Sequence, residues 1–124
     1  MKIVERLKLE TITSDFYQCN FSKNEDLIII DFVDKKLEFQ DYLIVKSGYP
    51  NEEIWMHYDY YTEDRMKKHC LYEIENSCWI EELKKMNRIH PRHRDELFQN
   101  YRHFIILFED EVFECIASTF KISD

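Results

Sequence analysis

Apolar and polar residues alternate along much of the first 60 positions, which is the two-residue period of β-strands. The clearest runs are residues 27–33, which read LIIIDFV, and residues 37–45. Two such runs separated by the polar residues 34–36 predict a β-hairpin. Shorter alternating stretches occupy residues 3–11, 17–21 and 54–60. The first half of the chain therefore predicts an antiparallel meander of about five strands.

The helical period replaces this alternation in the second half of the chain. Its apolar positions are Trp79, Ile80, Leu83 and Met86, and Ile89 extends the same stripe. Ser77 precedes them and is a suitable N-cap, and Pro91 ends the helix because the residue before a proline is pushed out of the α region. A shorter helix is expected over residues 97–101. Residues 65–75 have an ambiguous pattern, and we assign them as helical.

The last apolar segment predicts a second hairpin. Residues 104–108 alternate, residues 109–111 are acidic and form a turn, and residues 112–117 return. Strands and helices do not alternate along the chain, so a parallel sheet is not expected. We predict a single α+β domain spanning residues 1–124, with an antiparallel sheet (about a five-strand meander plus the C-terminal hairpin) and one to three helices packed on one face.

Composition removes several classes of function. The chain of 124 residues contains one glycine, Gly48, so it has no glycine-rich loop of the kind that cradles a nucleotide phosphate. Its longest apolar run, residues 104–108, is far shorter than the roughly 20 residues of a membrane helix. Charge interrupts the N-terminus too early for a signal peptide. Four cysteines without paired spacing favour free buried thiols in a reducing compartment, so we expect a cytoplasmic protein.

Charge is unevenly distributed along the chain, which has 17 basic and 25 acidic residues and a net charge of −8. Residues 84–103 have the opposite sign, with six basic and two acidic residues and a net charge of +4. The six are Lys84, Lys85, Arg88, Arg92, Arg94 and Arg102. Arginine suits phosphate and carboxylate recognition, so this basic island is a candidate site for an anion or RNA. The alternative is that these cations complement a helix C-terminus and pair with the acidic first half of the chain.

Histidines within and beside the island raise the question of metal and acid–base chemistry. His90 and His93 are three positions apart, but Pro91 lies between them and no paired cysteines support them, so we expect no metal site and no cofactor. His103 and Glu114 are expected to lie across the closing hairpin as an acid–base pair. A structural hydrogen bond is the more common role of such a pair, and the sequence favours a protein that is not an enzyme.

An acidic and aromatic cluster precedes the helix. Its members are Trp55, Asp59, Tyr60, Glu63 and Asp64. Tyrosine and tryptophan are favoured anchors in protein interfaces, and the carboxylates would attract a basic protein. We therefore expect non-catalytic protein binding, of the kind performed by an inhibitor or immunity-type partner of a basic protein, with these residues as the contact surface.

Short motifs in the last 50 residues resemble a pattern found in uncharacterised small bacterial proteins. They are Asn76-Ser77-Cys78-Trp79-Ile80, Asn87-Arg88-Ile89-His90-Pro91, Arg102-His103-Phe104 and Phe113-Glu114-Cys115-Ile116-Ala117. The resemblance implies a bacterial cytoplasmic setting and a shared fold, and it implies no particular function.

Overall fold

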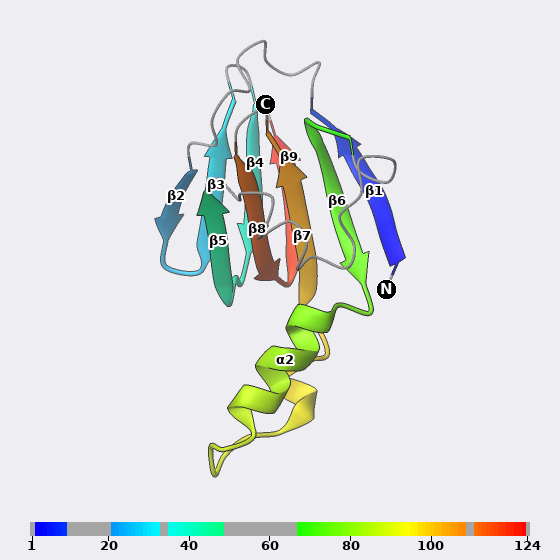
Figure 1. Ribbon diagram of the computed structural model, residues 1–124. Coiled ribbons are helices and arrows are strands. Elements are labelled where there is room, and N and C mark those ends of the chain that lie inside the picture. The colour runs from blue at the N-terminus through cyan, green and yellow to red at the C-terminus, as the bar shows by residue number, and fades with distance from the viewer. Residues whose placement is uncertain (1, 10–20, 33–34, 49–66, 109–110, 124) are drawn as a thin grey trace.

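The computed structural model describes residues 2–9, 21–32, 35–48, 67–108 and 111–123. Its strands are β1 (Lys2–Lys8), β2 (Phe21–Asn24), β3 (Leu27–Asp31), β4 (Lys36–Gln40), β5 (Ile44–Gly48), β6 (Cys70–Glu75), β7 (Arg102–Leu107), β8 (Val112–Ala117) and β9 (Thr119–Ser123). Its helices are α2 (Cys78–Asn87) and the short 3₁₀ helix η1 (Asp95–Phe98). The strands are antiparallel and the helices are grouped in one separate segment, so the broad α+β class is confirmed (Figure 1).

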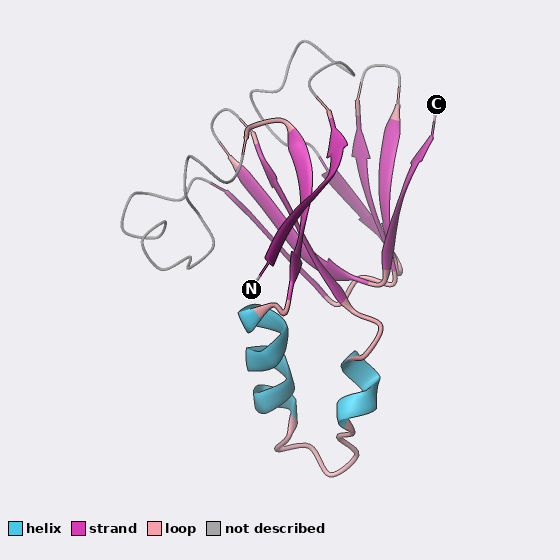
Figure 2. Cartoon of the chain, turned by 90° about the vertical axis from the view of Figure 1, so that its right-hand side faces the viewer, coloured by secondary structure: helices cyan, strands magenta, loops and turns pink. Residues whose placement is uncertain are grey.

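The strands form two antiparallel sheets, and the prediction of a single sheet was wrong. One sheet has the order β1-β6-β7-β8-β5 and the other β2-β3-β4-β9. Phe39 of the second sheet packs on Phe104 and Phe113 of the first, with ring centroids 5.2 and 5.4 Å apart. All three side chains are fully buried, so the main core lies between the two layers, which Figure 2 shows edge-on.

Both predicted hairpins are present, as the β3–β4 and β7–β8 pairs. The run 37–45, however, is not one strand, because β4 ends at Gln40 in one sheet and β5 begins at Ile44 in the other. Asp41, between them, has φ 53°, in the left-handed region that breaks an extended chain. The chain changes layer here, and a period-two pattern cannot indicate such a change because it continues on both sides of the bend.

Residues 65–75 were wrongly assigned as helical, since β6 occupies Cys70–Glu75 between β1 and β7. The first five residues of this strand are all buried, so both of its faces are covered and no alternation is visible. A short apolar run of this kind cannot be distinguished from a buried helix by periodicity. His69 and Asn76 mark its ends, with φ of 64° and 56°.

Helix α2 begins where the sequence predicted. The Ser77 Oγ accepts a hydrogen bond from the Ile80 N–H at 3.2 Å, and the helix ends at Asn87, four residues before Pro91. It does not pack on a sheet face, contrary to our prediction. Instead α2, the following turn and η1 form a helical arm, residues 78–101, that projects from the end of the sandwich (Figures 1 and 2).

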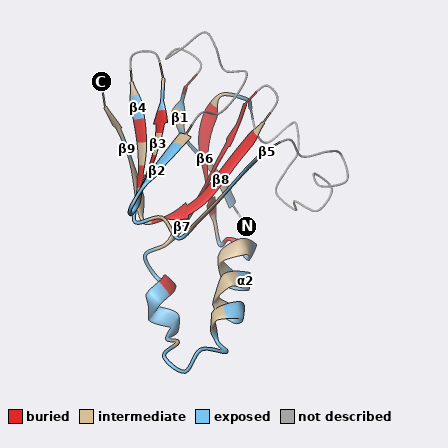
Figure 3. Cartoon of the chain, turned by 90° about the vertical axis from the view of Figure 1, so that its left-hand side faces the viewer, coloured by how far each residue is buried: buried red, intermediate tan, exposed pale blue. Residues whose placement is uncertain are grey.

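Burial differs sharply between the sandwich and this arm. Strands β6, β7 and β8 are almost wholly buried, whereas α2 has no buried residue and Phe98 is the buried residue of η1 (Figure 3). Neither α2 nor any other helix in the described ranges is long and apolar enough to cross a membrane. Cys70 and Cys115 are buried in the sandwich, while Cys78, at the start of the arm, is exposed.

Candidate functional site

A buried polar chain lies where the arm leaves the sandwich. The His103 Nε2 is 2.7 Å from the Glu114 Oε1, and the His103 Nδ1 is 2.7 Å from the Ser77 Oγ. The Lys46 Nζ is 3.6 Å from the second carboxylate oxygen of Glu114 and 4.0 Å from the centroid of the Trp79 ring. The Trp79 ring in turn meets the His103 ring edge-on, with centroids 5.2 Å apart. Four elements of the fold thus meet at this point.

One arrangement of protons accounts for the three hydrogen bonds that join Ile80, Ser77, His103 and Glu114. Because the Ser77 Oγ already accepts from the Ile80 N–H, its own hydroxyl is free to donate to the His103 Nδ1. The His103 Nε2–H then donates to the carboxylate of Glu114. A serine, a histidine and a carboxylate in series are also the parts of a nucleophilic site.

The burial of Ser77, His103 and Glu114 argues against a reaction of these three side chains with a substrate from solution. The exposed fractions of His103, Glu114 and Ser77 are 0%, 1% and 4%. The Ser77 hydroxyl oxygen is also engaged as the cap of α2. The arrangement therefore fixes the root of the arm to the sandwich. The sequence predicted that His103 and Glu114 are neighbours and that Ser77 caps the helix. It did not predict the contact between Ser77 and His103, because no local pattern links residues 26 positions apart.

The basic island divides into paired and exposed cations. Lys84 lies 3.1 Å from a carboxylate oxygen of Glu81, and Arg88 lies 3.2 Å from one of Asp95. Arg102 is not on the arm surface at all, because it begins β7. These three cations have carboxylate partners, with Glu73 the partner of Arg102, but none of the three carboxylates lies in the acidic first half of the chain, where the alternative placed them.

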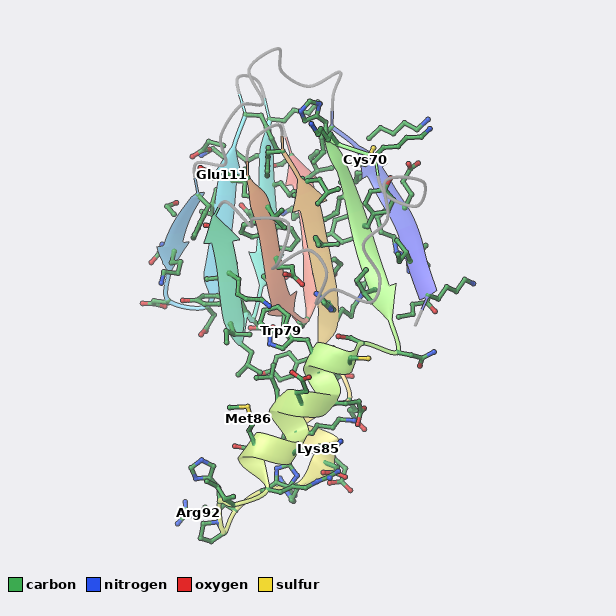
Figure 4. All side chains as sticks on the ribbon, in the orientation of Figure 1. Cys70, Trp79, Lys85, Met86, Arg92 and Glu111 are labelled. Carbon is green, nitrogen blue, oxygen red and sulfur yellow. The ribbon has the colours of Figure 1, made fainter. Side chains whose placement is uncertain are left out.

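Three cations of the island project without an ion pair to any residue that the structure describes. They are Lys85, Arg92 and Arg94, and all three are exposed. Beside them Met86 and Ile89 are 68% and 83% exposed, although both are large apolar side chains. We call these five residues the arm tip. Figure 4 shows Met86 extending outward from α2 and Arg92 at the far end of the arm.

His93 links the turn of the arm to the helices on either side of it. The Asn87 Nδ2 and the His93 Nδ1 are 2.8 Å apart, and the His93 Nε2 is 2.6 Å from the Asp95 Oδ1. The bond from His93, and after it the bond from Arg88, lower the pKa of Asp95. In the described ranges no three histidine, cysteine or carboxylate residues group as metal ligands would, and His90 lies exposed.

Arg102 belongs to a separate ion cluster at the same end of the sandwich. Its Nε–H and Nη2–H donate to the two oxygens of Glu73 at 2.9 and 2.7 Å, and Arg6 donates to one of them at 2.9 Å. Its guanidinium lies 5.0 and 5.7 Å from the ring centroids of Phe104 and Phe120. The bonds from Arg102 first, and from Arg6 second, hold the pKa of the largely buried Glu73 below its ordinary value. The same pairing raises the pKa of Arg102.

The acidic and aromatic surface predicted from the sequence lies outside the described residues. Its members are Trp55, Asp59, Tyr60, Glu63 and Asp64. It therefore stays a prediction.

Comparison with protein-family models, with curated proteins and with solved structures found no match for this chain. The resemblance of the C-terminal half to small bacterial proteins gains no support from it.

Proposed function

We propose that this chain is a non-catalytic protein-binding domain that contacts its partner with the arm tip. The observation that carries the proposal is the exposure of Met86 and Ile89 on an element that projects away from the core. Single exposed apolar side chains are common, but two within four residues of each other near the end of a projecting arm offer apolar surface that a partner could bury. Lys85, Arg92 and Arg94 add exposed positive charge to the same end of the arm, so the partner surface would combine apolar and acidic groups.

The aromatic residues of the arm favour a protein over RNA as the partner. Binding of single-stranded RNA relies on exposed aromatic rings on which bases stack. Phe98 is buried and packs edge-on against Tyr101, with centroids 5.7 Å apart, and Trp79 stands against His103 at the root. No described residue of the arm tip is aromatic. Aliphatic side chains among cations suit a protein surface better than a row of bases.

The test is capture from a nuclease-treated lysate of the source organism with tagged wild-type protein and matched variants. We expect Arg92→Glu/Arg94→Glu to reduce capture of a stoichiometric partner by at least about 10-fold, because like charges across an interface repel. Ile89→Ser should also reduce capture, through loss of the apolar contact. The control Lys8→Glu/Lys121→Glu makes the same change of charge at exposed positions on the sandwich. Equal capture by the arm variant and this control would contradict the proposal.

A narrower proposal, also of non-catalytic protein binding, is that the chain is an inhibitor or immunity-type partner of a basic protein. It is supported by the net charge of −8 and by the acidic and aromatic residues 55–64. Alanine at Trp55, Asp59 and Tyr60 would separate that surface from the arm tip in the same capture experiment.

A second candidate function is anion or RNA binding through the basic island, which the exposure of Lys85, Arg92 and Arg94 favours. A titration with RNA oligonucleotides and inorganic phosphate at low salt tests it. Under our proposal no saturable binding is expected. If RNA did bind, Arg92→Glu/Arg94→Glu would abolish the binding while Ile89→Ser left it unchanged, because phosphate contacts are electrostatic.

A further inference from the structure

The sandwich presents an acidic edge at the end from which the arm projects. Glu25 and Asp26 form the turn between β2 and β3, and Asp41 follows β4. These segments are adjacent, since the Tyr42 N–H donates to the Asp26 carbonyl at 3.2 Å. All three carboxylates are exposed, and beside them Leu43 is 41% exposed (Figure 3). We call Glu25, Asp26, Asp41 and Leu43 the acidic edge.

Hydrogen bonds place this edge at the root of the arm. Ser118, which precedes β9, donates from its N–H to the Gln40 carbonyl at 2.9 Å and from its Oγ to Asp41 at 3.1 Å. The neighbouring Thr119 accepts from Arg102, the first residue of β7 and the point where the chain returns from the arm. The acidic edge and the basic arm tip therefore lie at opposite ends of the arm.

The two surfaces have complementary properties. The arm tip combines three exposed cations with two exposed apolar side chains, and the acidic edge combines three exposed carboxylates with Leu43. None of the six charged groups has an ion pair with a residue that the structure describes. Within one molecule the arm holds the two surfaces apart, because ten helical residues span about 15 Å.

We propose that the partner of the arm tip is a second copy of this chain. Two molecules related by a twofold axis would place their arms side by side and antiparallel, so that each tip lies on the acidic edge of the other molecule. A twofold interface requires one surface that complements itself, and a basic end and an acidic end separated along one arm provide such a surface. Met86 and Ile89 of each molecule would pack near Leu43 of the other. This inference rests on the proposed function of the arm tip and names its partner.

Oligomeric state measured by sedimentation equilibrium, from dilute to concentrated protein, tests the proposal. Wild-type protein should be dimeric at low salt and dissociate as salt rises, because screening weakens exposed charge pairs. Arg92→Glu/Arg94→Glu should raise the dissociation constant by about 100-fold, and so should Glu25→Lys/Asp41→Lys. The control Lys8→Glu/Lys121→Glu should leave the dissociation constant within about 3-fold, because both lysines lie away from the two surfaces.

The decisive experiment mixes the two reversed variants. Each alone brings like charges together at both contacts, whereas a mixed dimer pairs the glutamates of one arm with the lysines of the other edge. The mixture should therefore regain the dimer that neither variant forms. Every substituted residue is exposed, so circular dichroism should match that of wild-type protein. The edge variant alone should have a lower thermal midpoint, because Asp41→Lys loses the hydrogen bond from Ser118.

A wild-type protein that is monomeric at every concentration, or a mixture that stays monomeric, overturns the homodimer. The proposed function fails separately, when the arm variant and the lysine control capture the same partner equally. If the wild-type protein is monomeric but the arm variant no longer captures a different protein from the lysate, the homodimer is disproved. Protein binding through the arm tip then still stands.

Discussion

Glu114→Ala should lower the free energy of unfolding by about 2 to 3 kcal/mol, because it leaves a buried donor without its acceptor, which costs roughly 1–3 kcal/mol, and also leaves a cavity in the core. Glu114 is 1% exposed and lies 2.7 Å from the His103 Nε2. The substitution deprives that buried nitrogen of its carboxylate acceptor and also removes an anion beside Lys46. Urea unfolding followed by fluorescence measures the change.

Two further variants separate the hydrogen bond from the loss of a side chain. Glu114→Gln retains an oxygen that accepts from the His103 Nε2–H, so its loss should be smaller than that of the alanine variant. Glu38→Ala removes a half-buried glutamate from strand β4 of the other sheet and should cost less than about 1 kcal/mol. If Glu114→Ala were as stable as Glu38→Ala, the buried polar chain would not support the root of the arm.

Glu73→Gln should cost about 2 to 3 kcal/mol at neutral pH, because it leaves Arg6 and Arg102 close together without the carboxylate that both bind. Glu73 is largely buried, whereas Glu75 is far more exposed and lies 3.8 Å from Arg6 alone. Glu75→Gln is therefore the matched control, with an expected loss below about 0.5 kcal/mol. Equal losses in the two variants would contradict the importance of the cluster.

The loss of stability caused by Glu73→Gln should become smaller as the pH falls. The pKa of Glu73 is lowered in the folded protein, chiefly by the hydrogen bond from Arg102. A carboxylate of this kind stabilises the fold fully above its ordinary pKa of 4.5, and the contribution is lost as pH falls through the lower folded value. The stability difference between wild type and variant should thus be constant near neutral pH and shrink in acid below pH 4.5. A difference that grew in acid would contradict this assignment.

Local patterns predicted the strands and the helix better than they predicted their assembly. Both hairpins and the start of α2 follow from alternation and from the cap at Ser77. The division into two sheets does not, because it depends on the bend at Asp41 and on which strands meet across the core. Strand β6 was missed for a physical reason, since a strand buried on both faces carries no alternation.

The candidate site was only partly visible in the sequence. Charge counting identified the basic island, but it did not separate Lys84, Arg88 and Arg102, which have carboxylate partners, from the cations of the arm tip. The acidic edge was not predicted, because Glu25 and Asp41 become neighbours only when β3 and β4 pair. Burial of His103 and Glu114 on adjacent strands likewise depends on the whole fold.

The arm interrupts a hairpin whose two strands are otherwise ordinary neighbours. Ile74 of β6 pairs directly with His103 of β7, and the intervening chain leaves the sheet and returns to it at almost the same place. The strand order of the sandwich therefore does not depend on what lies between these two residues. The arm beyond its root could therefore change in length and charge while the two strands that carry it keep their pairing.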